Sequence, residues 1–323
     1  MKVYVKASAR LHLGLIDLRG ELGRLWGGLG VGVNCPNVIL QAEKSRSLSV
    51  WGENSELVRP FVELFLKKYN VEPKVAVNVK RTIPQHVGLG SGTQLALATA
   101  VALARIFDIN ASVQELAAAV GRGKVSGVGT AVFEKGGFVV EGGVKIRNDK
   151  SILPHSFPPV IFQDSFPDDW FFTVAIPNVE RGLSGEVEAN AFSSLPPMST
   201  EQAGRLSRLI LMSLLPALKE KDIKTFGAAL TQIQNIVGDC FASVQGGRFA
   251  SSPSGECIAY MLKHGAFGAG QSSWGPTVYG LVEGEKQAEK LAVEVQGFLQ
   301  KSSGGQAFCT AANNRGAYIK ITP

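Results

Sequence analysis

The sequence predicts two units that each combine helices with strands, in an α/β or α+β arrangement. The chain has 323 residues, more than a single domain usually contains. Its first half mixes β-rich runs with helical segments, and three prolines between Pro154 and Pro159 then mark a crossing. We therefore expect an N-terminal unit at residues 1–155 and a C-terminal unit at residues 156–323.

Local patterns place the elements of the N-terminal unit. The opening MKVYVKASARLHLGL carries Lys6 and Arg10 where a signal peptide would need an unbroken apolar stretch, so we expect a strand there. The run VAVNV predicts another strand. Ser112 and Glu115 form a capping-box pattern, which predicts a helix that ends near Gly121.

The C-terminal unit shows the same mixture. We expect a strand at Trp170–Ile176 and a long helix that opens with the capping-box pattern at Ser199–Gln202. Helical periodicity covers Lys286–Gln300, and short strands are expected around Phe308 and Tyr318.

Composition and charge narrow the function classes. The 33 Lys and Arg against 27 Asp and Glu give a net charge of +6, which suits a small anionic substrate, and no basic block of the kind that follows a nucleic-acid backbone is present. The longest apolar run, Leu95 to Ala104, has about half the length of a membrane span. The four cysteines form no CxxC pair, so we expect reduced thiols rather than disulfides or zinc. These features predict a soluble, cytoplasmic protein that binds neither nucleic acid nor membrane.

The stretch VGLGSGTQLALATA, residues 87–100, is the first candidate binding element. Gly88, Gly90 and Gly92 leave the backbone bare and free to take positive φ, so peptide N–H groups can surround an anion. A helix starting near Ser91 adds its own N–H groups at the same point. A glycine turn that only lets a buried helix pack on a strand is the alternative. The stretch fits neither a Walker A loop nor GxGxxG.

Two further glycine clusters, Gly27–Gly32 and Gly268–Gly275, suggest additional flexible loops. Near the first of them, four polar residues fall within fifteen positions: Arg10, His12, Asp17 and Arg24. We interpret this group as an anion and metal site, although a single His or Asp in such a position is often structural.

Two motifs carry a resemblance to the GHMP kinase superfamily, named for galactokinase and homoserine, mevalonate and phosphomevalonate kinases. Residues Pro84–Thr93 resemble its central motif, and Gly268–Val278 resembles its third motif. The resemblance implies an N-terminal domain like domain 2 of ribosomal protein S5 and a ferredoxin-like C-terminal domain. It also makes Ser91 the candidate ligand of Mg²⁺ beside the phosphates.

One departure separates the chain from many kinases of that superfamily. Their Ser-Gly-x-Asp stretch supplies a carboxylate that takes the proton of the attacking hydroxyl, whereas this chain has Ser126-Gly-Val-Gly129. A closer resemblance accounts for the difference. The strings SARLHLGLIDL, HVGLGSGTQLALA and GRGKVSGVGTAVFEKGGFVVEGG look like the archaeal beta-ribofuranosylaminobenzene 5'-phosphate synthase family, along nearly the whole chain.

That resemblance implies a reaction and its partners. The family joins phosphoribosyl pyrophosphate to a para-substituted benzoate, either 4-aminobenzoate or 4-hydroxybenzoate, and releases carbon dioxide and pyrophosphate in methanopterin synthesis. The new bond is a C-glycoside, and a homodimer is implied. Because pyrophosphate departs from an oxocarbenium-like centre, catalysis should depend on placed charges rather than on a side-chain nucleophile.

The predicted roles follow from charge type and proximity. The predicted catalytic residues are Asp17, which would hold Mg²⁺ or the ribose hydroxyls, and Arg24, which would clamp phosphate or pyrophosphate. Ser91 would lie beside the metal. Arg122 and Lys124 could bind a second anion or form a solvated basic turn, and the serines of the third motif could instead cap backbone. The predicted substrate-binding residues are Arg10, His12, Gly88, Gly90, Ser91, Gly92, Thr93, Arg122, Lys124, Gln271, Ser272 and Ser273. Two other function classes stay open, an ATP-dependent kinase of a small alcohol and a non-catalytic ligand sensor.

Overall fold

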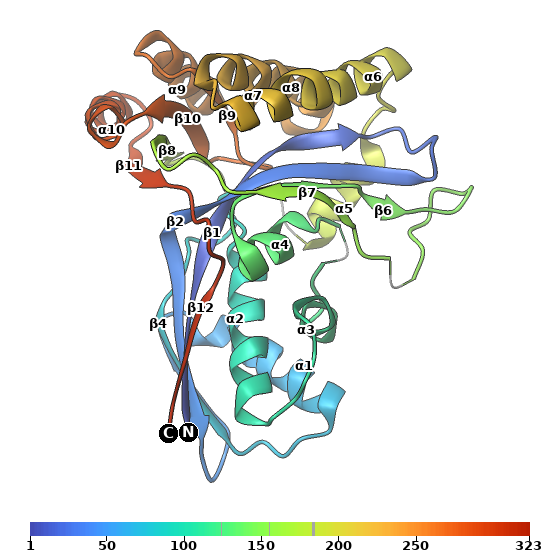
Figure 1. Cartoon of the computed structure of the whole chain (residues 1–323), viewed down its shortest axis with the longest axis vertical. Helices are drawn as coiled ribbons and strands as arrows, with labels where there is room; N and C mark the ends of the chain where they lie inside the picture. Colours follow the sequence, from blue (N-terminus) through green and yellow to red (C-terminus); the bar gives the residue numbers. More distant parts are fainter. Residues whose placement is uncertain (124, 155, 183–184) are drawn as a thin grey trace.

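The computed structural model describes residues 1–323 except Lys124, His155, Leu183 and Ser184, and only the backbone of Gly185, Glu186 and Ala189. Two sheets divide the molecule, one below and one above in Figure 1. The lower, eight-stranded sheet has the order β12-β1-β2-β4-β3, with β5 and β6 paired to the first part of β2 and β7 paired to β5. Its strands are β1 (Lys2–Asp17), β2 (Arg24–Lys44), β3 (Ser49–Gly52), β4 (Val75–Arg81), β5 (Phe138–Glu141), β6 (Val144–Lys145), β7 (Val160–Asp164) and β12 (Tyr318–Thr322).

The long β1–β2 hairpin is the axis of the fold. Its burial changes along β1: residues 2–6 alternate between exposed and buried, whereas residues 7–15 are buried on both faces except Arg10. Strands that are covered on both faces show such continuous burial. Beyond this change β1 also contacts α8 (Ile223–Gln245), whose Gln234 Nε2 donates a hydrogen bond to the Leu13 carbonyl.

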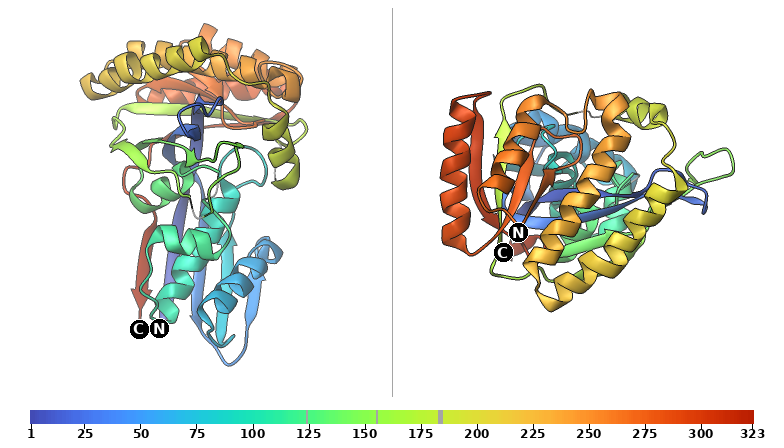
Figure 2. Two further views of the ribbon diagram at one scale, coloured as in Figure 1. Left: turned by 90° about the vertical axis from the view of Figure 1, so that its right-hand side faces the viewer. Right: turned by 90° about the horizontal axis from the view of Figure 1, so that it is seen from above.

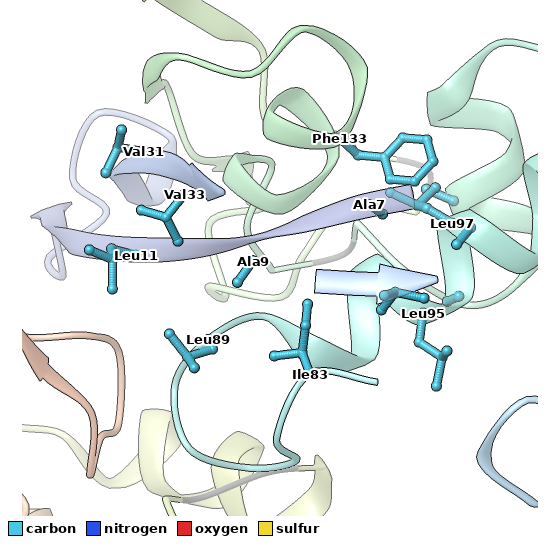
Figure 3. Close-up of a cluster of buried hydrophobic side chains, with 14 of the residues drawn as sticks. Ala7, Ala9, Leu11, Val31, Val33, Ile83, Leu89, Leu95, Leu97 and Phe133 are labelled. Carbon is cyan, nitrogen blue, oxygen red and sulfur yellow. The ribbon is translucent and has the colours of Figure 1, made fainter. Parts of the chain in front are cut away.

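Helices α1 (Arg59–Tyr69), α2 (Ser91–Ile106), α3 (Val113–Ala119) and α4 (Val128–Lys135) cover one face of this sheet. Almost every residue of α2 is buried, since its alanines let the helix lie close to β1 and β2. Figure 3 shows part of the resulting core, with Leu95 and Leu97 of α2 near Ala7 of β1 at one end of the view and Leu11 near Leu89 at the other.

The upper sheet is antiparallel, in the order β11-β8-β10-β9. Helices α8, α9 and α10 pack on it, and α8 also contacts β1 (Figure 2). The elements are β8 (Trp170–Pro177), β9 (Gly268–Gln271), β10 (Val278–Glu283), β11 (Gly305–Ala311), α5 (Gly185–Ser194), α6 (Thr200–Leu209), a π-helical turn (Ile210–Leu214), α7 (Leu215–Glu220), α8 (Ile223–Gln245), α9 (Ser252–Lys263) and α10 (Glu285–Gln300). Among the described residues, no helix is both long and apolar enough to cross a membrane.

The elements expected from local patterns are present. Both capping boxes form: Ser112 caps α3 together with Glu115, and Ser199 caps α6 together with Gln202. The strands expected in the C-terminal unit appear as β8, β11 and β12, and the expected periodic helix is α10. The helix expected near Ser91 begins at that residue.

The two sheets do not divide the chain at residue 155. Strand β7, residues 160–164, pairs with β5 of the lower sheet, and the chain crosses to the upper sheet only before β8. Strand β12 then returns and pairs with β1. A boundary based on prolines cannot detect such returns, because they depend on pairing between residues far apart in the sequence.

The expectation of flexible loops at Gly27–Gly32 and at the start of Gly268–Gly275 is wrong. The first cluster lies inside β2, where a Cβ on Gly30 would stand 2.4 Å from Val128 Cγ1 of α4. The second begins with β9, where a Cβ on Gly268 would stand 2.3 Å from the carbonyl oxygen of Gly227 in α8. These glycines therefore permit helices to lie close against strands.

Candidate active site

The glycine loop before α2 has the geometry of an anion site. Gly88 and Gly90 take positive φ, 90° and 73°, and Gly90 is the N-cap of α2 without a side-chain cap. The first helical hydrogen bond runs from Gln94 N–H to the Gly90 carbonyl at 3.1 Å. The N–H groups of residues 91–93 therefore have no acceptor within the helix. Buried Leu89 anchors the loop, with its side chain beside Ile83 in Figure 3. The bare N-terminus of α2 is suited to negative charge.

Three segments meet at the Gly88 carbonyl oxygen. It accepts hydrogen bonds from Arg10 Nη1 at 2.6 Å and from Ser272 Oγ at 2.7 Å. Ser272 Oγ accepts in turn from the backbone N–H of His12 at 2.9 Å. Strand β1, the glycine loop and the segment after β9 are thereby fixed to one another. The hydroxyl of Ser272 serves the backbone, as the alternative interpretation of the third-motif serines expected.

Two arginines flank the N-terminus of α2. A Cβ on Gly90 would lie 3.3 Å from Arg10 Nε, and a Cβ on Gly92 would lie 3.1 Å from Arg122 Nη2. Burial lowers the pKa of Arg10 to about 10, which still leaves its side chain a cation at neutral pH, and burial also lowers the pKa of Arg122. Arg122 Nε is buried and has no hydrogen-bond partner among the residues that the structure describes. Two partly desolvated guanidinium groups therefore face the same helix end.

These residues border a cavity of about 400 Å³ between the two sheets. Its walls come from β1, the start of α2, residues 121–123, 125 and 126, α5, α8 and the segment after β9. The lining side chains that carry the chemistry are Arg10, His12, Thr93, Arg122, Ser126, Glu188, Phe192, Phe241, Gln245, Arg248, Phe249, Gln271, Ser273 and Trp274. The volume is that of a site for small molecules.

One side of the cavity is an aromatic wall formed by Phe192 of α5, Phe241 of α8 and Trp274. The ring centroids lie 4.6 Å apart for Phe241 and Trp274, and 5.2 Å apart for Phe192 and Trp274, with edge-to-face geometry in both pairs. The indole Nε1 of Trp274 donates a hydrogen bond of 3.0 Å to Glu188 Oε1. Burial raises the pKa of Glu188, against the opposing effects of this hydrogen bond, Arg10 and Arg122.

His12, which lines the cavity, and Glu141, which does not, both lie close to Gly28. A Cβ on Gly28 would stand 2.8 Å from Glu141 Oε1 and 3.2 Å from His12 Nε2. Burial, together with the cation of Arg10, lowers the pKa of His12 to about 3, so its ring is neutral. Burial also raises the pKa of Glu141 to about 7, although Glu141 Oε2 accepts a hydrogen bond from Gly143 N–H at 2.6 Å.

The structure gathers part of the predicted set. The predicted residues that line the cavity are Arg10, His12, Thr93, Arg122, Gln271 and Ser273. Ser91 and the three glycines of the central motif form the adjoining loop and helix start, and Lys124 lies outside the described residues.

Asp17 and Arg24 lie elsewhere, at the far end of the β1–β2 hairpin. Asp17 Oδ1 accepts hydrogen bonds from the backbone N–H groups of Arg19 and Gly20, at 2.6 and 3.1 Å. Arg24 Nη1 donates to the Gly143 carbonyl at 2.8 Å. Asp17 follows Arg10 by seven residues along β1, up to about 23 Å at ~3.3 Å per residue. In this arrangement Asp17 and Ser91 cannot hold one metal ion together, and the catalytic roles assigned to Asp17 and Arg24 stay predictions.

Sequence reasoning missed the aromatic wall and Glu188. Glu188 and Phe192 are four residues apart on α5, a spacing that puts both on one helix face. The same spacing relates Val237 and Phe241 on α8. These pairs were detectable, but nothing local indicated that both helices face the segment that carries Trp274.

The residues at the loop fit a magnesium ion that is held largely by substrate. The described residues contain no group of three or more His, Cys, Asp and Glu side chains able to hold a metal. Ser91 Oγ donates to Gln85 Oε1 at 3.2 Å, which leaves its oxygen lone pairs available. Magnesium commonly binds one or two protein groups together with phosphate oxygens and water. Ser91 and the phosphate oxygens of a bound ligand would supply such a set.

Comparisons with known proteins identify the family and agree with the described fold. The model of the GHMP kinases N terminal domain matches residues 56–137, and that of the GHMP kinases C terminal matches residues 214–301. The chain is 37% identical to the beta-ribofuranosylphenol 5'-phosphate synthase of Methanothermobacter thermautotrophicus, over 99% of both chains, and 32% identical to that of Archaeoglobus fulgidus, over 98% and 99%. The crystal structure of homoserine kinase from Cytophaga hutchinsonii shares the fold, with a TM-score of 0.69 and 17% identity over 99% and 97% of the chains.

Proposed function

We infer a specific reaction from the premise that this chain belongs to the beta-ribofuranosylphenol 5'-phosphate synthase family of the GHMP kinase superfamily. Membership makes the chain an enzyme with the two-domain GHMP fold, as the sequence motifs predicted. The proposed reaction joins phosphoribosyl pyrophosphate to a para-substituted benzoate and releases carbon dioxide and pyrophosphate. Because the relatives are named for a ribosyl phenol, 4-hydroxybenzoate is the first acceptor to test and 4-aminobenzoate the second.

The observation that carries this proposal is the division of one cavity into a basic part and an aromatic part. Arg10, Arg122 and the N-terminus of α2 form the basic part, where pyrophosphate would receive charge-assisted hydrogen bonds. The rings of Phe192, Phe241 and Trp274 form the other part, suited to a benzoate ring. A sugar that carries pyrophosphate and an aromatic acid would meet where the two parts join.

The proposed chemistry needs placed charge rather than a nucleophilic side chain. As the bond from ribose C1 to pyrophosphate breaks, negative charge grows on the leaving group, and the cations of Arg10 and Arg122 stabilise that charge. The ring carbon that bears the carboxylate bonds to C1, and loss of carbon dioxide restores aromaticity. A magnesium ion on Ser91 and the pyrophosphate oxygens would supply further positive charge to the leaving group.

The kinase alternative is not favoured. The carboxylate of the kinase motif is replaced by Gly129, which packs so closely that a Cβ there would meet Thr93 Cγ2 at 3.1 Å. Curated kinases appear among the weaker relatives, such as the putative 4-diphosphocytidyl-2-C-methyl-D-erythritol kinase of Staphylococcus aureus, 25% identical over 73% of this chain.

The test is release of labelled carbon dioxide. Purified protein with magnesium, phosphoribosyl pyrophosphate and carboxyl-labelled 4-hydroxybenzoate or 4-aminobenzoate should release label only when both substrates are present. No release with either benzoate would refute the reaction, and consumption of ATP with small alcohols would then support a kinase.

The family resemblance also supports three proposals about context: a place in methanopterin synthesis, a cytoplasmic location and a homodimer. Light scattering on the purified protein tests the last, since a mass near 34.3 kDa would contradict the dimer.

A further inference from the structure

Glu188 is the one acidic side chain among the described residues that line the cavity. It lies one helical turn before Phe192 on α5, so the carboxylate and the aromatic ring occupy the same helix face. The hydrogen bond from Trp274 Nε1 fixes Glu188 Oε1 at 3.0 Å. Because the indole is itself packed edge-to-face against Phe192 and Phe241, the carboxylate is held at the border of the aromatic wall.

The side-chain amides that line the cavity already have hydrogen-bond partners. Gln271 Oε1 accepts from Ala250 N–H at 2.7 Å, and Gln271 Nε2 donates to the Ser273 carbonyl at 3.0 Å. Gln234 Nε2 donates to the Leu13 carbonyl at 2.7 Å. An amide does not accept a proton at neutral pH, and these two amides hydrogen-bond to the backbone around the cavity.

The charged and titratable groups around Glu188 come from several elements: Arg10 and His12 from β1, Arg122 from the segment before α4, and Arg248 from the segment after α8. His12 is a poor proton acceptor, since burial and Arg10 oppose its cation. For Glu188 the two influences oppose each other: burial favours the protonated acid, whereas the charges of Arg10 and Arg122 favour the carboxylate. Of these groups, Glu188 is the one that can both accept a proton and return it.

We propose that Glu188 is the catalytic base that takes the proton from the para-hydroxyl group of the acceptor ring, and so makes the site selective for the hydroxybenzoate reaction. The proposal rests on the proposed function. It extends that function by assigning the residue that activates the ring.

The step balances in atoms and electrons. The acceptor O–H bond breaks, the proton passes to Glu188 Oε2, and the oxygen electron pair enters the ring and enriches the para carbon, which bears the carboxylate. That carbon bonds to ribose C1 as the C1–oxygen bond breaks and its electron pair leaves on pyrophosphate. The bond to the carboxylate then breaks, its electron pair restores the aromatic ring, carbon dioxide departs, and the ring oxygen recovers the proton from Glu188. An amino group donates its lone pair without losing a proton, so 4-aminobenzoate depends less on the base.

The experiment compares Glu188→Gln with the wild type on both benzoates, and uses Glu201→Gln, the same change at an exposed position of α6, as the matched control. Glutamine can still accept the hydrogen bond from Trp274. We expect kcat/KM for 4-hydroxybenzoate to fall ~100-fold or more, the usual contribution of a general base, and that for 4-aminobenzoate to fall less than ~10-fold. The control should match the wild type on both.

The pH profile separates a base from a merely structural residue. In the wild type, kcat/KM for 4-hydroxybenzoate should fall on the acid side as Glu188 becomes protonated, and this acid limb should be absent with 4-aminobenzoate and in Glu188→Gln. If Glu188→Gln fails to fold, judged by circular dichroism, Trp274→Phe replaces it. That variant keeps an aromatic ring but removes the indole donor, and should lower the preference for 4-hydroxybenzoate ~3-fold or more.

Each result decides the proposal. Three results would overturn the role of Glu188: an equal loss of kcat/KM with both benzoates, no loss with either, or the same acid limb with both. The proposed function would still stand in these cases if the wild type released carbon dioxide. No release by the wild type with either benzoate would overturn both.

Discussion

Substitution of Gly88 by alanine probes the junction of the three segments at the site. Gly88 has φ of 90°, and its Cβ would stand 2.2 Å from the carbonyl oxygen of Ser272, a backbone atom that cannot rotate away. Gly246 offers a matched control. Its φ is 81°, but a Cβ there would meet nothing within 4 Å.

The two substitutions share the cost of a left-handed alanine, roughly 1 kcal/mol. For Gly88→Ala the loop must also move by about 1 Å to relieve the contact, which weakens the hydrogen bonds to the Gly88 carbonyl from Arg10 and Ser272. Such bonds contribute about 0.5–3 kcal/mol each, the larger value for the charged donor. We expect the free energy of unfolding to fall by about 3–5 kcal/mol in Gly88→Ala and about 1 kcal/mol in Gly246→Ala.

Urea denaturation of both variants, followed by circular dichroism, measures the difference. In Gly88→Ala the affinity for phosphoribosyl pyrophosphate should also fall, because the displaced loop carries the start of α2. If the two variants lost stability equally, to within about 1 kcal/mol, the close junction at Gly88 would not stabilise the fold as described.

Three further predictions concern the cavity and the packing around it. Arg122→Met should raise KM for phosphoribosyl pyrophosphate ~10-fold or more through loss of charge-assisted hydrogen bonds, whereas Arg105→Met on the exposed end of α2 should leave it unchanged. Burial raises the pKa of Glu141 to about 7, so the native protein binds this proton more tightly than the unfolded chain does. The free energy of unfolding of the wild type should therefore decline between about pH 5 and pH 8, by on the order of 2 kcal/mol relative to Glu141→Gln. Urea unfolding at a series of pH values measures this decline. Gly30→Ala should lower the unfolding free energy by about 1–3 kcal/mol through overlap with α4, whereas Gly204→Ala, within α6 and facing open space, should raise it by up to about 1 kcal/mol; the same sign for both would contradict this account.

Local chemistry allowed much of the fold to be predicted. The capping boxes at Ser112 and Ser199 act within four residues, so the sequence pattern alone determines where those helices begin. The loop at Gly88–Gly92 was also predictable, since positive φ and a helix start are local properties. The prediction of a flexible loop at Gly27–Gly32 failed, because the sequence does not distinguish a glycine that lets a helix pack closely on a strand from a glycine in a loop.

The candidate site was predictable on one side of the cavity only. Arg10, Thr93 and Arg122 lie in or beside recognisable motifs, whereas Glu188 and Phe241 reach the cavity from α5 and α8 through tertiary packing. Conversely, Asp17 and Arg24 are close to Arg10 in sequence but not in space, because the extended strand β1 carries the chain away from Arg10 before it reaches them.

The pairing of β12 with β1 bears on how the protein is made. Lys2 pairs with Thr322, so the two ends of the chain lie together at the foot of the molecule in Figure 1. On the ribosome, β12 emerges after every strand of the upper sheet, and until then the outer edge of β1 presents open backbone groups that could pair with another nascent chain. The lower sheet is thus the last to be completed during synthesis. A circular permutant that joins the two adjacent ends and opens the chain elsewhere would let β12 pair with β1 earlier in synthesis.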